Sequence, residues 1–160
     1  MKIERVDAFA IRLPPTTTGD GAKSVSTKSV STGSVSHDYY IAPDSWTSIY
    51  SRRHETCLVR LQSDDGHVGW GEAQAPVSPR ATAVIVEDLC RPMLTGGDAL
   101  DVEYWWYRMY SAMRERGHIT GFYVDALAGV DLALYDLLGK AQGLPAHRLL
   151  GGRFRDAVRV

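Results

Sequence analysis

Residues able to do chemistry are sparse in this chain of 160 amino acids. The sequence contains no Gly-x-Ser-x-Gly turn, no glycine-rich phosphate loop and no His-Glu-x-x-His pair. The histidines do not cluster, and each is interpreted as a surface or capping residue: His37, His54, His67, His118 and His147. We therefore expect no catalytic residue and no metal ligand in this chain.

Composition and charge argue against several classes of protein. The net charge is -1 and Lys and Arg are spread along the chain, which argues against nucleic acid or an anionic membrane as a partner. No apolar run reaches the roughly 18 residues of a membrane span, and the N-terminus lacks a signal-peptide core. We expect a soluble, cytoplasmic protein. Cys57 and Cys90 form no Cys-x-x-Cys pair, and two buried thiols are favoured over a single disulfide.

The elements that must position any site begin with strands. Residues 2–13 alternate as a strand that Pro14 and Pro15 end. Residues 54–61 and 67–72 alternate in the same way, and an Asp-Asp-Gly turn joins them. This pattern predicts a three-stranded antiparallel sheet.

Three helices are predicted after the sheet. The first begins at Ser78-Pro79, with Ser78 as N-cap, and ends at Pro92. Asp98 caps the second, which ends near Gly117. The third spans residues 121–142, and its buried stripe comprises Tyr123, Leu127, Val130, Leu134, Leu137 and Ala141. Strands followed by helices predict an α+β domain.

The stretch from residue 16 to residue 53 differs in kind from the rest. Residues 16–36 are rich in Ser, Thr and Gly and hold a short Lys-Ser-Val-Ser-Thr repeat that offers little to bury. The far end of the stretch is aromatic, with Tyr39, Tyr40 and Trp46. We predict a long loop whose residues 16–36 are mobile without a ligand. Loops of this length inside a compact domain are usually functional lids or disordered segments.

One segment, residues 129–152, resembles the signature of the mandelate racemase/muconate lactonizing enzyme family of the enolase superfamily. The family pattern is G-[IV]-D-x-A-L-x-D-x-x-G-K-x-x-G-x-P followed by L-L-G-G, and every fixed position is filled. Residues 2–6 (KIERV) and 69–72 (GWGE) resemble the family's first strand and hairpin. The likeness covers residues 1–13 and 54–160 and leaves out the insert between them.

The resemblance implies an N-terminal domain that caps a TIM-type barrel. Residues 1–142 would be this capping domain, with a lid at 14–53, and residues 143–160 would be a linker and the start of the barrel. A strand is expected from Ala157, and the chain is expected to stop before the barrel's catalytic residues. Barrel carboxylates would bind Mg²⁺, and barrel bases would remove a proton α to a substrate carboxylate.

The function implied is that of a Mg²⁺-dependent lyase, a dehydratase of an acid sugar or hydroxy acid. A racemase or cycloisomerase of the same family is the alternative, and a non-catalytic capping or binding module is a third. The family also implies a homo-oligomer. The lid residues expected to set specificity are Tyr39, Tyr40, Trp46 and Val77, which either wall the substrate pocket or pin the lid to the domain.

The conserved-looking positions of the signature are interpreted as structural. Gly129 and Gly139 would allow close helix packing, and Asp131 and Asp136 would satisfy backbone or Arg groups. For Glu72, in the hairpin, a structural hydrogen bond is favoured over contact with substrate.

Overall fold

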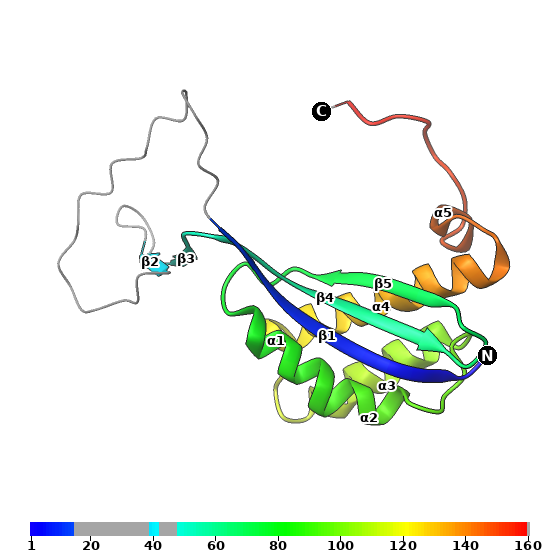
Figure 1. The fold of residues 1–160 in the computed structure, drawn as a ribbon, viewed down its shortest axis with the longest axis horizontal. Coiled ribbons are helices and arrows are strands. Elements are labelled where there is room, and N and C mark those ends of the chain that lie inside the picture. The colour runs from blue at the N-terminus through cyan, green and yellow to red at the C-terminus, as the bar shows by residue number, and fades with distance from the viewer. Residues whose placement is uncertain (15–38, 42–47, 160) are drawn as a thin grey trace.

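The computed structural model describes residues 1–14, 39–41 and 48–159. Its main sheet is antiparallel with strand order β1-β4-β5, where β1 spans Ile3–Leu13, β4 His54–Ser63 and β5 Val68–Ala73 (Figure 1). The turn between β4 and β5 places Gly66 at φ 90°, a conformation that favours glycine. The predicted three-stranded sheet and its Asp-Gly turn are confirmed.

Helices form a second layer against this sheet (Figure 1). In chain order they are α1 (Pro79–Ile85), the π-helix η1 (Val86–Cys90), α2 (Arg91–Leu94), α3 (Val102–Arg114) and α4 (Phe122–Gln142). α4 packs along β5 and β4, and α3 packs on α4. The apolar core lies between the layers; its largest fully buried side chains include Ile3, Leu61, Leu94, Met109, Leu127, Leu134 and Leu137. The α+β class is confirmed.

Glycines allow α4 to lie directly on the backbone of β5. A Cβ on Gly71 would overlap the carbonyl oxygen of Gly129, and a Cβ on Gly69 would overlap that of Ala133. A Cβ on Gly129 would in turn lie 2.7 Å from the Cβ of Ala73. The two glycine-bearing segments singled out in the sequence are therefore the two sides of one seam.

Ser78 occupies the N-cap position before Pro79, as predicted, whereas the N-cap predicted at Asp98 is wrong because Asp101 precedes α3. Ser78 has φ 56°, in the left-handed region, and its side chain makes no cap hydrogen bond. Asp98 lies before the start of α3, which begins at Val102, and its Oδ1 accepts from the backbone N–H of Leu100 at 3.1 Å. Asp98 instead forms a β-bridge with Lys2, which ties this loop to the sheet.

Pro92 does not end the first helical region, contrary to prediction. The chain passes from α1 through η1 into α2, with Pro92 in the first turn of α2. The first turn of a helix can accept a residue without an N–H, and the wider π-helix before it changes the hydrogen-bond register. The other end signals behave as predicted, because Gly143 closes α4 at φ 64°.

The ends of the insert and of the chain also differ from prediction. Inside the expected loop, β2 (Tyr39–Ile41) and β3 (Ile49–Ser51) pair as a small antiparallel sheet. Beyond α4 a short helix, α5 (Ala146–Leu149), is present, and residues 157–159 form no strand. A strand needs a neighbour to pair with, and the described residues place none beside this segment.

Candidate functional site

Four segments meet where the insert joins the sheet, on the left of Figure 1. They are the end of β1, strand β2, the start of β4 and the turn at residues 74–79 that precedes α1. One residue from each, namely Arg12, Tyr39, Glu55 and Ser78, makes polar contact with the others. We call these four residues the insert-end cluster.

Glu55 is the buried centre of the insert-end cluster. It lies on the helix-facing side of β4, in phase with the buried residues Cys57 and Val59, and is 8% exposed. Arg12 stands directly opposite on β1, and its Nε lies 2.9 Å from Oε1 of Glu55. The pair therefore keeps a charged carboxylate inside the domain with its countercharge at hand.

Tyr39 attaches the insert to this ion pair. Its hydroxyl donates to Oε2 of Glu55 at 3.1 Å and accepts from Nη2 of Arg12 at 2.6 Å. The guanidinium carbon of Arg12 lies 5.6 Å from the centre of the Tyr39 ring. The backbone N–H of Ser78 points to the same hydroxyl at 3.3 Å. One donor and two acceptor positions are thus in use, which is the capacity of a hydroxyl.

Ser78 attaches the turn at residues 74–79. Its backbone N–H donates to Oε2 of Glu55 at 3.1 Å as well as to Tyr39. Ser78 is the one non-glycine residue with positive φ in the described part of the chain. A positive φ costs free energy in a residue that has a Cβ, so contacts with the surrounding residues must hold Ser78 in this conformation.

Two of the four predicted specificity residues, Tyr39 and Val77, are found in or beside this region. Tyr39 belongs to the insert-end cluster, and half-buried Val77 precedes Ser78 in the turn. Tyr40 lies in β2, with its side chain outside the described residues, and Trp46 and residues 16–36 lie outside them altogether. Contact of these residues with a substrate, and mobility of residues 16–36, stay predictions.

Sequence reasoning missed Arg12, Glu55 and the backbone role of Ser78. A signal for Glu55 was available: the alternation of Cys57, Val59 and Leu61, extended by one step toward the N-terminus, puts a carboxylate on the buried side. A charge in a buried phase implies a partner. The register that brings Arg12 opposite Glu55 depends on the sheet itself.

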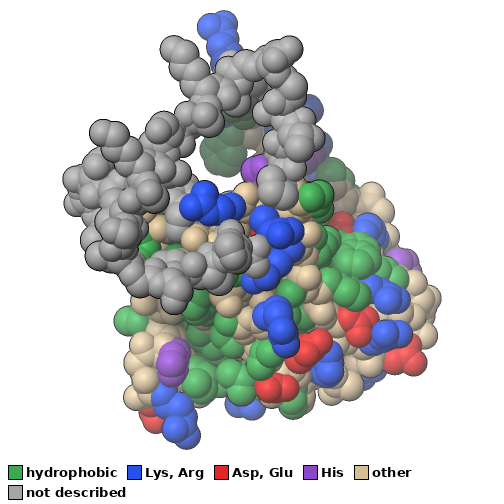
Figure 2. Space-filling model, turned by 60° about the vertical axis from the view of Figure 1, so that its left-hand side comes forward, with side chains coloured by type: hydrophobic (Ala, Val, Ile, Leu, Met, Phe, Trp, Pro, Cys, Tyr) green, Lys and Arg blue, Asp and Glu red, His purple; other side chains and the backbone are tan. Residues whose placement is uncertain are grey.

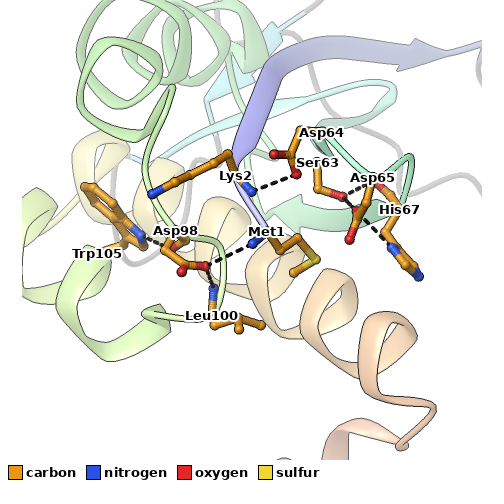
Figure 3. A network of polar contacts seen from close by, with 9 residues as sticks. All are labelled: Met1, Lys2, Ser63, Asp64, Asp65, His67, Asp98, Leu100 and Trp105. Carbon is orange, nitrogen blue, oxygen red and sulfur yellow. Dashed lines mark hydrogen bonds and ion pairs between the residues drawn. The ribbon is translucent and has the colours of Figure 1, made fainter.

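A second polar network closes the opposite end of the sheet (Figure 3). Asp64 Oδ1 accepts from the backbone N–H of Lys2 at 2.9 Å, and the N-terminal ammonium lies 3.8 Å from Oδ1 of Asp98. The carbonyl oxygen of Asp98 also accepts from the indole N–H of Trp105 at 2.6 Å. These contacts hold the first residues of the chain against the α2–α3 loop.

Ser63, Asp65 and His67 lie within this second network, but their arrangement is that of a turn. Ser63 Oγ donates to Oδ1 of Asp65 at 2.5 Å, and Nδ1 of His67 lies 3.0 Å from the same oxygen. These bonds, that from Ser63 first, lower the pKa of Asp65 to about 2. The serine and the imidazole both contact the carboxylate and do not contact each other in the way that activates a nucleophile.

Of the two acidic residues of the signature helix, Asp136 contacts the edge strand β5, and Asp131 lies near Glu103 of α3. Asp136 Oδ2 accepts from the backbone N–H of Trp70 at 2.7 Å, and Lys140 Nζ donates to Asp136 at 2.6 Å and to Val68 O at 2.9 Å. The backbone contact predicted for Asp136 is confirmed, and together with Lys140 it covers the free edge of β5. Burial, followed by the charge of Glu103, raises the pKa of Asp131.

Glu72 and Gly139 make close contacts of the structural kind predicted for them. Thr56 Oγ1 donates to Oε1 of Glu72 at 2.6 Å, which gives Glu72 the hydrogen bond favoured for it. Gly139 lets the carbonyl of Leu144 approach, since an added Cβ would lie 2.7 Å from that oxygen. Cys57 and Cys90 are free and buried, as expected, and burial raises the pKa of Cys90 to about 12.

The described residues hold neither a cluster of metal ligands nor a helix able to cross a membrane. Residues 1–14, 39–41 and 48–159 contain no group of three or more His, Cys, Asp or Glu side chains able to hold a metal ion. In the same ranges, every helix is too short or too polar to cross a membrane.

The comparison with protein families matches residues 30–151 to the N-terminal domain of mandelate racemase / muconate lactonizing enzyme. The match includes residues 30–53, which corrects the expectation that the whole insert lies outside the likeness. Among solved structures, a member of the enolase superfamily from Agrobacterium tumefaciens superposes with TM-score 0.73 and 32% identity over 94% of this chain and 37% of its own. A mandelate racemase/muconate lactonizing protein from Paracoccus denitrificans, in complex with magnesium, gives 0.67 and 27% over 96% and 31%.

Two curated relatives are enzymes of sugar acids or their lactones. D-galactarolactone cycloisomerase from Agrobacterium fabrum is 40% identical over 108 residues, which are 68% of this chain and 28% of that enzyme. D-galactonate dehydratase from Verminephrobacter eiseniae is 41% identical over 103 residues, which are 64% and 26%. The chain therefore spans about a quarter of the length of these relatives.

Proposed function

Because this chain belongs to the mandelate racemase / muconate lactonizing enzyme family through its N-terminal domain, we propose that it is the capping domain of an enzyme that acts on acid sugars. The reaction proposed is dehydration that begins with removal of a proton α to the substrate carboxylate. The observation that carries the proposal is the likeness to D-galactonate dehydratase, at 41% identity over 103 residues. The chemistry would reside in a barrel contributed by residues other than those described.

The magnesium ion that the family implies does not fit the residues described. No three potential ligands lie together in residues 1–14, 39–41 or 48–159. The structure in complex with magnesium from Paracoccus denitrificans supports Mg²⁺ as the cofactor of the larger protein. We derive no step through the metal from this chain.

The part played by this chain is to shape and cover the substrate pocket. Strand β2 of the insert and the turn at residues 74–79 meet at one end of the sheet, joined through the insert-end cluster. Covering loops exclude water and set which substrates fit, and they act on binding more than on the chemical step. Within them, Tyr40, Trp46 and Val77 are the proposed contacts with substrate, and Tyr39 is the proposed anchor because its hydroxyl is already occupied.

The charge distribution suits an anionic substrate. Figure 2 shows basic side chains gathered in a row on one face of the molecule, with acidic side chains lower in the view. Arg52 and Arg53 are exposed just before β4, whereas the charge of Arg12 is paired with Glu55. A positive potential there would favour the approach of a carboxylate.

The test joins this chain to the barrel of the Verminephrobacter eiseniae dehydratase in place of the matching segment. We expect Mg²⁺-dependent loss of water from an acid sugar by the fusion, and no turnover by the barrel alone or by the 160-residue chain alone. The barrel rejoined to its own domain controls for damage at the junction. A folded fusion that turns over none of a panel of acid sugars, while the rejoined control is active, would show that the chain does not cap such a barrel.

Cycloisomerisation is the second candidate, favoured by the likeness to D-galactarolactone cycloisomerase at 40% identity. The two reactions differ in their products, because dehydration releases water and leaves a keto acid, whereas isomerisation conserves mass. A matching fusion to the cycloisomerase barrel, assayed with sugar lactones and analysed by product mass, separates them.

A further inference from the structure

The buried carboxylate of Glu55 has more partners than charge balance requires. Arg12 neutralises it through Oε1, at 2.9 Å. The second oxygen, Oε2, receives two further hydrogen bonds, from the hydroxyl of Tyr39 and from the backbone N–H of Ser78, each at 3.1 Å. These two donors come from two different surface segments, the insert and the turn at residues 74–79.

Oε2 of Glu55 bridges these segments, because it accepts a hydrogen bond from each of them. The backbone hydrogen bonds among the described residues include none that joins β2 to residues 74–79. The remaining link is the contact of Ser78 with the Tyr39 hydroxyl, at 3.3 Å, and that hydroxyl is itself held by Glu55. Oε2 of Glu55 thus holds a donor from each segment, and Arg12 holds the same Tyr39 hydroxyl at 2.6 Å.

Ser78 shows that the link bears on the backbone of the turn. Its φ of 56° directs the N–H toward Oε2 of Glu55, although a side chain beyond glycine disfavours this conformation. A strained residue that persists is fixed by its surroundings, and this N–H contact is the polar interaction that fixes it. Without an acceptor at Oε2, the turn loses the polar contact that opposes relaxation.

We propose that Glu55 is a positioning residue that locks strand β2 and the turn at residues 74–79 into one substrate-facing unit. The inference rests on the proposed capping function for its consequence, but the lock itself is a property of this chain. Strand β2 and Val77 would then move together, and substrate preference would depend on a residue that substrate does not touch. Glu55→Gln tests the lock because an amide offers one acceptor oxygen where the carboxylate offers two.

The first experiment measures amide hydrogen exchange in the 160-residue chain by nuclear magnetic resonance. In Glu55→Gln we expect the Ser78 amide and the β2 amides to exchange roughly five- to tenfold faster together, as loss of about one net hydrogen bond implies. In Tyr39→Phe we expect faster exchange at Ser78, although residue 39 is far from it in sequence. The double variant should exceed neither single variant by much, because both remove the same link.

Glu72→Gln is the matched control. Glu72 lies on the same sheet and accepts a side-chain bond from Thr56, but it contacts neither segment of the lock. Its variant should leave exchange at Ser78 and β2 unchanged, and the core amides of α4 should stay protected in all variants. The proposal is overturned if Ser78 exchange is unchanged in Glu55→Gln, or if the Ser78 and β2 amides respond independently.

The second experiment uses the active fusion described above. Glu55→Gln should raise KM or reorder acid-sugar preference by roughly tenfold, with kcat within about threefold, as expected when closure geometry and not chemistry changes. Glu55→Asp, which keeps two acceptor oxygens, should restore part of the preference. If no fusion is active, the proposed function fails while the exchange result still decides the lock. If the exchange result is positive but KM and preference do not change, the lock exists and its role in specificity is refuted.

Discussion

The two ends of the central sheet are closed by polar networks of opposite character. At the insert end, a carboxylate that is 8% exposed binds groups from β1, β2 and the turn before α1. At the other end, Asp65 is exposed and binds mainly its neighbours Ser63 and His67 (Figure 3). The contacts of Glu55 join segments far apart in the chain, whereas those of Asp65 shape a single turn beside the longer-range contacts of Lys2 and Asp98.

The difference follows from what each end must hold. A hairpin turn is stabilised by its own residues, and a local, solvated carboxylate is sufficient for that. The insert end has no short turn, because β1 and β4 are separated by the whole insert. A buried, multiply bonded group can fix such distant segments, and its removal is correspondingly costly.

The seam between α4 and β5 serves both ends, so breaking it should erase the contrast. Gly71→Ala would place a Cβ against the carbonyl oxygen of Gly129, where backbone must move. We expect a loss of about 3 kcal/mol in the free energy of unfolding, with amide protection lost at both ends of the sheet. Urea denaturation measures the loss. Glu72→Ala, at the next exposed position of β5, is the control, and equal stability of the two variants would contradict the close packing seen here.

The insert end should be the more sensitive of the two to loss of its carboxylate. Glu55→Ala leaves Arg12, the Tyr39 hydroxyl and the Ser78 N–H without their shared partner, and we expect a loss of about 2 kcal/mol. Asp65→Ala should lower the free energy of unfolding clearly less, because water can replace the contacts of an exposed carboxylate. Chemical denaturation of both variants in one buffer checks the order. An Asp65 variant as destabilised as the Glu55 variant would remove the distinction between the ends.

The sequence predicted the elements whose evidence is local. Alternation predicted β1, β4 and β5, the Asp-Gly pair predicted their turn, and periodic apolar residues with Gly143 predicted α4. The glycines of both signature segments predicted a close backbone approach, although not that they face each other. Each of these signals lies within a few residues of the feature it predicts.

The insert-end cluster could not be predicted in the same way, because its contacts depend on the fold. Glu55 meets Ser78 and Tyr39 only after β1 and β4 have paired and α1 has packed. Ser78 matched the side-chain preference of an N-cap, yet the acceptor at Glu55 engages its backbone and sets a left-handed conformation. Pro92 was misleading because a π-helix before it changes the local register. Tertiary context overrode a sound local rule in each case.

Two opposite substitutions, Ser78→Gly at the insert end and Gly66→Ser in the hairpin turn, test the cost of positive φ at each end of the sheet. Ser78→Gly retains the N–H and relieves the cost of φ 56°, so we expect a gain of about 0.5 kcal/mol after the greater freedom of glycine in the unfolded chain. Gly66→Ser, at φ 90° in the hairpin turn, should lose about 1 kcal/mol. Thermal unfolding compares them. Loss of stability in both variants would mean that the Ser78 side chain contributes more than its strained backbone costs.

The smallest expected effect is the pH dependence of the hairpin end. The pKa of Asp65 is lowered from 3.8 to about 2, first by the hydrogen bond from Ser63 and then by that with His67. A folded-state pKa below the unfolded value means that the unfolded chain binds the proton more readily. The stabilisation is therefore complete above about pH 4 and is lost as pH falls toward 2.

Asp65→Asn should be less stable than the unmodified chain near neutral pH, and the difference should shrink through this window. Ser63→Ala should raise the carboxyl pKa, measured by carbon chemical shifts, toward 3.8. A stability difference that instead grows on acidification would have the wrong sign for a lowered pKa, and would place the acid sensitivity of this domain elsewhere than in its hairpin turn.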